Sequence, residues 1–243
     1  LLHVDDTARL GYWRALLGAD TPPAANPRDP LQLMLFAALG HGRRPVAELQ
    51  DAFAELWAMT EIRAELIELL GELDDRRRRP TWALADLPFR VHATYSRDEI
   101  SAGLGQLRKG KLLRTQGGVY KDSGARADIL FVTLHKDEKE FTPTTLYEDY
   151  PISPTRFHWE SQSVTRADSD TGRRYQEHVQ RGWRILLFVR PSKYDDRRIT
   201  RPYLFLGPVR YVEHESEKPM RIIWALERPM PPDFFQQVKV AAG

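Results

Sequence analysis

The chain has 243 residues, of which 42% are hydrophobic and 29% charged, which is ordinary for a globular protein with one large or two small domains. No apolar run is long enough to span a bilayer and no signal-peptide pattern is present, so we expect no membrane partner and a cytoplasmic location. The absence of cysteine excludes disulfides and thiolate zinc sites, and the seven histidines form no HxH or HExxH pair. We therefore expect no metal and no cofactor. Because the chain begins at Leu1 and not at Met, we also expect it to be a fragment of a longer protein.

Positive charge is concentrated in one part of the sequence. The net charge is only +2, but residues 156–201 hold 11 Lys and Arg against 6 Asp and Glu, and ten of the eleven cations are Arg. Arginine is suited to bidentate contacts with phosphate and guanine. The distribution predicts a functional basic face within this segment, although five extra charges over 46 residues do not make a nucleic-acid tail.

Before residue 80 the spacing of apolar residues is typical of helices. Asp5 and Asp6 offer caps, Pro30 suits a first helical turn, and Ser96 with Glu99 forms a capping box for a later helix. The helices expected before residue 80 cover residues 1–20, 31–39, 46 onward and 60–79.

After residue 80 the pattern predicts strands and short polar loops. The run 183–226 reads as a three-stranded meander, with a bulge or an edge kink at Gly207-Pro208. We expect an α+β protein in which a helical N-terminal part precedes a mainly antiparallel curved sheet or a small β-barrel, by analogy a PUA-like one. The predicted domains are 1–85, helical, and 86–243, mainly β. The predicted strands cover residues 128–134, 183–190, 203–212 and 220–226, and a short helix follows them.

Residues 150–175 lie between two predicted strands and look too polar and irregular for a core. They combine aromatic rings, hydroxyls, an amide and arginines, which together are the groups that recognise bases and phosphates. We predict a nucleic-acid site here and in the loop that follows residue 190, while core packing explains each aromatic equally well. The candidate binding residues are Arg156, His158, Trp159, Ser161, Gln162, Arg173, Arg174, Tyr175, Lys193 and Arg197.

Several stretches resemble a bacterial domain of uncharacterised function. These are residues 95–100, 130–136, 141–162, 171–175, 185–190, 202–208 and 218–224, and the run ISPTRFHWESQS at 152–163 is the most specific. The domain occurs at the C-terminus of long proteins with a DEAD/DEAH-type helicase core, often with a phospholipase-D-type nuclease module. The resemblance is stronger after residue 90. It implies a non-catalytic accessory domain that works with helicase and nuclease modules, in phage defence or restriction.

The helicase motifs themselves are absent, because the chain contains neither a GxxxxGK[ST] loop nor an Asp-Glu-Ala-Asp/His box. We therefore predict no enzyme activity and a DNA-binding recognition domain, with duplex DNA as the partner and a modified or flipped base as its target.

Two alternatives stay open. The first is a docking module that tethers a helicase, for which helical residues such as Trp13, Phe53 and Trp57 could form a groove. The second is a metal-dependent nuclease, in which Asp128 and the run Asp137-Glu138-Lys139 faintly match a two-carboxylate and lysine pattern.

Overall fold

The computed structural model describes residues 2–114, 117–135 and 149–240. Its internal contacts divide the chain into two compact units, Leu1–Thr115 and Gln116–Gly243, called the first and second unit below. The domain boundary predicted between residues 85 and 86 falls inside the first unit and stays a prediction. Within the described residues, no helix has both the length and the apolar character needed to cross a bilayer.

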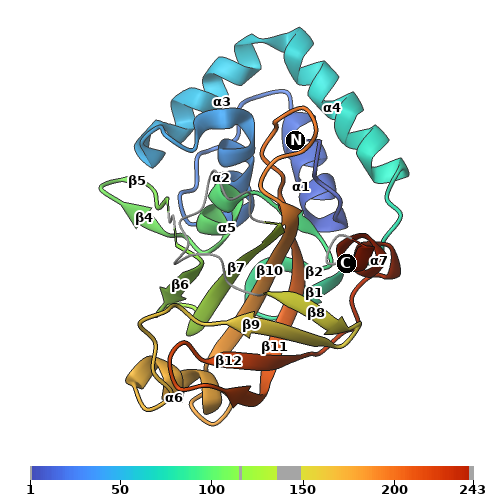
Figure 1. The fold of residues 1–243 in the computed structure, drawn as a ribbon. Coiled ribbons are helices and arrows are strands. Elements are labelled where there is room, and N and C mark those ends of the chain that lie inside the picture. Colours follow the sequence, from blue (N-terminus) through green and yellow to red (C-terminus); the bar gives the residue numbers. More distant parts are fainter. Residues whose placement is uncertain (1, 115–116, 136–148, 241–243) are drawn as a thin grey trace. The chain divides into compact units, whose positions relative to one another are not determined.

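The first unit is helical up to residue 75 and then mixes short strands with one more helix (Figure 1). Its elements are α1 (Thr7–Leu17), α2 (Pro30–Phe36), a π turn (Ala37–His41), a 3₁₀ turn (Val46–Glu48), α3 (Leu49–Ala58), α4 (Thr60–Asp75), β1 (Trp82–Leu84), β2 (Leu87–Val91), β3 (Thr94–Tyr95), α5 (Arg97–Gly103), β4 (Leu107–Arg108) and β5 (Lys111–Leu112).

The predicted helix starts are confirmed by side-chain caps. Asp6 accepts the backbone N–H of Arg9 at α1. At α2, Asp29 accepts a backbone N–H and Pro30 occupies the first turn. Ser96 and Glu99 form the capping box at α5. Each cap satisfies amide groups that the first helical turn leaves without partners.

A buried ion network joins α1 to α5. The Arg9 guanidinium is fully buried and donates to Asp6 at 2.5 Å, to Glu99 at 2.7 Å and to the carbonyl oxygen of Thr94 at 2.7 Å. The Cζ atom of Arg9 lies 4.0 Å from the centre of the Tyr95 ring. A charge without these partners would be too costly to bury, so the network fixes how the two helices pack.

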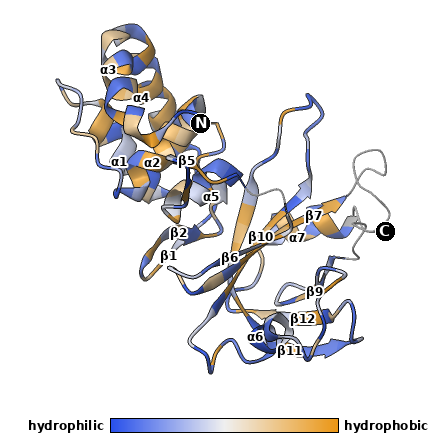
Figure 2. Cartoon of the chain, turned by 90° about the vertical axis from the view of Figure 1, so that its left-hand side faces the viewer, coloured by the Kyte–Doolittle hydropathy of each residue, from blue (hydrophilic) through white to orange (hydrophobic). Residues whose placement is uncertain are grey.

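The second unit is built on a mixed sheet. Its described strands are hydrogen-bonded in the order β6-β7-β10-β11-β12-β9-β8, and only β7 and β10 run parallel. Figure 1 shows β10, β11 and β12 as the predicted meander, and Figure 2 shows that β7 and β10 are strongly hydrophobic. The elements are β6 (Val119–Asp122), β7 (Ala127–His135), β8 (Tyr150–Ser153), β9 (Arg156–Glu160), α6 (Asp170–Gln176), β10 (Arg184–Ser192), β11 (Tyr203–Glu215), β12 (Arg221–Leu226) and α7 (Pro232–Val240).

The predicted α+β class is therefore confirmed, but the barrel alternative is wrong. Strands β6 and β8 stand at opposite ends of the strand order, and no pairing among the described residues joins them. The sheet is thus open. Because the PUA-like analogy assumed a barrel, it is no longer supported.

The bulge predicted in the third strand is present, but the strand is not at an edge. The pairing of β10 with β11 shifts between Leu187 and Phe188, where Gly207 has a φ of +99°. Strand β11 lies between β10 and β12 in the sheet. A bulge is one of the few places where an interior strand accepts proline, and Pro208 follows directly.

The prediction that residues 150–175 are too irregular for the core is wrong. They form β8, β9 and α6, and the side chains of Phe157, Trp159 and Tyr175 are at most 4% exposed. Strand β9 pairs with β12, and its alternate residues Phe157 and Trp159 face the core cluster of the second unit. The strand was not evident from the sequence, because its polar residues are largely buried as well and so break the usual alternation of buried apolar and exposed polar side chains.

Candidate functional site: an arginine-lined pocket

Half of the predicted binding residues are buried in the interior of the second unit. Trp159 meets Tyr175 edge to face, with ring centres 5.5 Å apart. Ser161 is fully buried, and its hydroxyl accepts the backbone N–H of Met220 at 2.9 Å. His158 is 9% exposed and stacks against Tyr150 at 4.6 Å. These contacts assign the four residues to packing, so the proposed ligand site does not include them.

Arg174 also has an internal partner. Its Nε and Nη2 donate to the two carboxylate oxygens of Asp128 at 2.7 and 3.2 Å, and the two side chains are 7% and 0% exposed. This bidentate pair ties α6 to β7. The neighbouring Arg173 is exposed, so the two adjacent arginines face in different directions.

The remaining predicted residues are accessible but scattered. Arg156, Gln162, Arg173 and Arg197 are exposed, and Lys193 is half-buried with its ammonium 4.8 Å from the centre of the Tyr194 ring. They come from the start of β9, the segment after β9, α6 and the loop between β10 and β11. The described structure does not gather them into one site.

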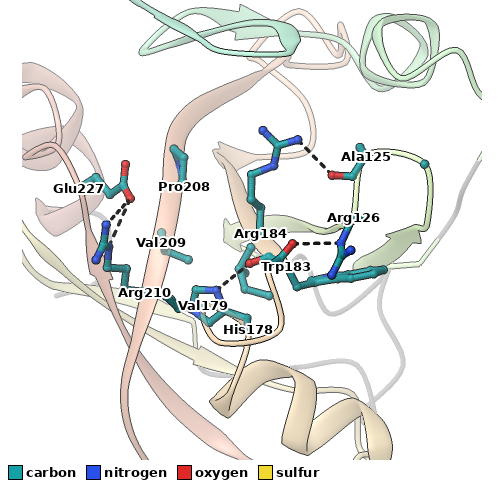
Figure 3. A pocket seen from close by; sticks show the side chains of 13 residues that line it. Ala125, Arg126, His178, Val179, Trp183, Arg184, Pro208, Val209, Arg210 and Glu227 are labelled. Carbon is teal, nitrogen blue, oxygen red and sulfur yellow. Dashed lines mark hydrogen bonds and ion pairs between the residues drawn. The ribbon is translucent and has the colours of Figure 1, made fainter.

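What the second unit does contain is a pocket of about 440 Å³ that sequence reasoning missed. It lies between the turn that joins β6 to β7, the segment that leads into β10, the middle of β11 and the residue after β12 (Figure 3). The pocket is lined by Gly124, Ala125, Arg126, His178, Val179, Gly182, Trp183, Arg184, Ile185, Pro208, Val209, Arg210 and Glu227.

Two of its arginines clamp the first two segments together. Arg126 donates through Nε to the carbonyl oxygen of Gly182 at 3.1 Å and through Nη2 to that of Arg181. In return, Nη2 of Arg184 donates to the carbonyl oxygen of Ala125 at 3.1 Å, as Figure 3 shows. Arg126 is nevertheless exposed, and no carboxylate among the described residues forms an ion pair with it. Its charge therefore remains available at the pocket.

The third arginine, Arg210, forms an ion pair with Glu227, the one carboxylate among the lining residues. Arg210 contacts Glu227 at 3.3 Å, and the two side chains are 64% and 42% exposed. Such a surface pair is worth at most about 1 kcal/mol, so a stronger anion can replace the carboxylate as the partner of Arg210. The lining thus has three cationic side chains against one anionic side chain.

His178 braces the pocket as a neutral ring. Burial lowers the pKa of His178, the Nε2 atom accepts the backbone N–H of Tyr211 at 3.2 Å, and Nδ1 contacts the carbonyl oxygen of Trp183 at 3.2 Å. A carbonyl oxygen can only accept, so the proton is on Nδ1. Both ring nitrogens are occupied, which leaves the histidine a positioning role.

The pocket could not be found from the sequence because its residues come from four distant segments. Arg184 falls in the basic segment 156–201, but Arg126 and Arg210 lie outside it. The structure shows a φ of +49° at Arg126, which an arginine in the sequence does not indicate.

The metal-dependent nuclease alternative gains no site among the described residues. Within the described part of the chain, no group of three or more histidine and acidic side chains could hold a metal ion. Of the nuclease candidates, Asp128 is occupied by Arg174, and Asp137, Glu138 and Lys139 lie outside the described residues.

Comparison with known proteins identifies the family. Residues 89–238, more than half of the chain, match the family described as a domain of unknown function (DUF3427). The chain belongs to this family, which confirms the predicted membership of a family of uncharacterised function. No curated protein matches the chain.

Proposed function

We propose that this chain is a cytoplasmic, non-catalytic DNA-recognition domain of a helicase- and nuclease-containing defence or restriction protein, and that DNA phosphate binds in the arginine-lined pocket. One observation carries the proposal: Arg126, Arg184 and Arg210 come from three segments and line the same pocket, whose lining includes a single carboxylate. Guanidinium groups match the geometry of phosphate oxygens and remain charged at any physiological pH.

The pocket also suits a nucleotide better than a simple ion. Beside the arginines its lining includes Val179, which is 58% exposed, and Trp183, which is partly buried. An apolar surface next to phosphate-binding groups can accommodate a sugar or a base. The finer proposal, that a modified or flipped base is read, therefore depends on Trp183, because Trp159 and Tyr175 are buried.

The exposed cations Arg156, Arg173 and Arg197 extend this proposal. Their charges need no fixed geometry to attract a duplex, since such contacts act through release of counterions. They are expected to add affinity that does not depend on sequence.

The docking alternative keeps one specific observation in its favour. Within the first unit, Ile62 on helix α4 is 48% exposed and Met59, the residue before this helix, is 44% exposed. An apolar docking face predicts binding to a protein partner that is insensitive to salt, unlike the DNA proposal.

The test is fluorescence anisotropy with labelled oligonucleotides at 50 and 200 mM salt. The panel contains plain duplex, single strand, duplexes with modified cytosine or adenine, and a phosphorothioate duplex. Arg210→Gln should weaken binding and lower the salt slope by about 1, whereas Glu227→Gln should strengthen binding. Both changes affect a surface pair, so neither should impair folding.

Lys239→Gln is the matched control, because it removes an exposed cation of the second unit that does not line the pocket. The proposal is refuted if no oligonucleotide binds at 50 mM salt. It is also refuted if Arg210→Gln and Glu227→Gln bind as Lys239→Gln does.

A further inference from the structure

The β4–β5 hairpin of the first unit is a second concentration of positive charge, outside the segment that the charge distribution singled out. Arg108 and Lys111 are direct cross-strand partners, and Lys109 and Gly110 form the two-residue turn between them. All three cationic residues are exposed. Figure 1 shows the hairpin standing out beside α2 and α5.

No nearby carboxylate neutralises these side chains. Among the described residues, Arg108, Lys109 and Lys111 form no ion pair. The two carboxylates closest in the chain are already engaged, Asp98 with Arg114 at 2.8 Å and Glu99 with Arg9 at 2.7 Å. The hairpin therefore presents its full charge to solvent.

This arrangement opposes the stability of the hairpin itself. The turn has positive φ at both residues, +51° at Lys109 and +74° at Gly110, as a type I′ turn requires. Asparagine, aspartate and glycine suit such positions, whereas lysine is strained there. In addition, like charges directly opposite each other on paired strands repel. Local stability does not explain three cations here, which points to a ligand.

The hairpin is also held in place before any ligand binds. The carbonyl oxygen of Gly110 accepts the backbone N–H of Val46 at 2.8 Å, and Pro45 forms an isolated bridge with Lys111. At the base, Ser101 donates its hydroxyl to the carbonyl oxygen of Leu113 at 2.6 Å. A fixed hairpin loses little conformational entropy on binding.

A fourth cation lies close to the hairpin in the chain, and one strand of the hairpin carries an exposed apolar side chain. Arg43 is exposed and lies two residues before Pro45, the bridge partner of Lys111. Leu107, on β4, is 44% exposed. A two-stranded ribbon with basic residues at its tip has the dimensions that a groove of duplex DNA admits, with phosphates on either side.

We propose that the β4–β5 hairpin binds duplex DNA, with Arg108, Lys109 and Lys111 against the phosphates that border one groove. This site is separate from the arginine-lined pocket and does not rest on it. It gives the first unit a direct part in DNA binding.

The central variant is Lys109→Asn in the full chain. It removes one charge but installs Asn-Gly, the preferred sequence of a type I′ turn, so the melting temperature should rise or stay level while duplex affinity falls. The double variant Lys109→Asn/Lys111→Thr should lower the salt slope of duplex binding by about 2. A loss of binding caused by unfolding would instead lower both affinity and melting temperature.

Arg28→Asn is the control, since Arg28 is an exposed loop cation of the same unit that does not belong to the hairpin. Unchanged affinity and salt slope in the double variant overturn the proposal. So does equal competition by single-stranded DNA, duplex RNA or polyglutamate, which would indicate general attraction of anions. Measuring Arg210→Gln in parallel separates the two sites. If Arg210→Gln weakens binding and the hairpin variants do not, the hairpin proposal fails and the pocket proposal stands. If only the hairpin variants weaken binding, the pocket proposal fails and the hairpin proposal stands.

Discussion

The adjacent residues Arg173 and Arg174 allow a sharp test of which arginines serve the fold. Replacing Arg174 with Met leaves the Asp128 carboxylate, which is 0% exposed, without its cation. Removing one partner of a buried pair costs about 3–5 kcal/mol, because the remaining charge is neither hydrated nor compensated. The same replacement at the exposed Arg173 should change the free energy of unfolding by no more than about 0.5 kcal/mol.

Urea unfolding of both variants measures this difference directly. Asp128→Asn combined with Arg174→Met should recover a large part of the loss, since a neutral buried pair avoids the stranded charge. DNA titrations below the unfolding transition complete the comparison. If Arg174→Met were as stable as Arg173→Met but bound DNA more weakly, Arg174 would be a ligand-contacting residue and the burial argument would be refuted.

Two further predictions concern the acid stability of the first unit and the tight approach of α6. Burial alone would raise the pKa of Glu99, but the charge of Arg9 outweighs it and lowers the pKa to about 2. Because this lies below the unfolded value of about 4.5, Glu99 contributes up to about 3 kcal/mol that is complete above pH 4.5 and is lost as the pH falls toward 2. The wild type should therefore lose more stability than Glu99→Gln between pH 5 and pH 3 in urea titrations, and parallel curves would contradict this. Gly172→Ala should destabilise by about 1–3 kcal/mol, because its Cβ would lie 2.6 Å from the carbonyl oxygen of Ala167, whereas Gly11→Ala, with open space around it, should not destabilise the protein. Thermal melts of the two alanine variants provide the comparison, and equal melting temperatures would show that α6 can shift to make room.

Local chemistry predicted the elements whose signals lie close together in the sequence. The caps at Asp6 and Ser96 depend on residues within one helical turn, and the meander β10-β11-β12 depends on short polar loops. The bulge at Gly207 was likewise readable from the Gly-Pro pair. In each case the residues that specify the structure are also the ones that form it.

Pairings between distant segments were not predictable in this way. The parallel pairing of β7 with β10 joins Ile129 to Leu186, and β9 reaches β12 through partners such as Trp159 and Ile222. These pairings decide which residues are buried, because a strand flanked on both sides can cover polar side chains as well as apolar ones. The polar residues of β9 (RFHWE, Arg156–Glu160) therefore suggested a loop. The strands on either side of β9 make it part of the core instead.

The same limit applies to charge, because an arginine count does not say which face an arginine occupies. Within 156–201, Arg174 is bound by Asp128, and Arg190 donates to the hydroxyl of Thr133 and to the carbonyl oxygen of Arg201. Conversely, Arg126 and Arg210 reach the pocket from segments with no excess of charge. A guanidinium can stabilise a fold or bind a phosphate with the same donors, and only its neighbours decide between the two. The DNA proposal is therefore strongest where carboxylates are scarce, at the pocket and at the β4–β5 hairpin.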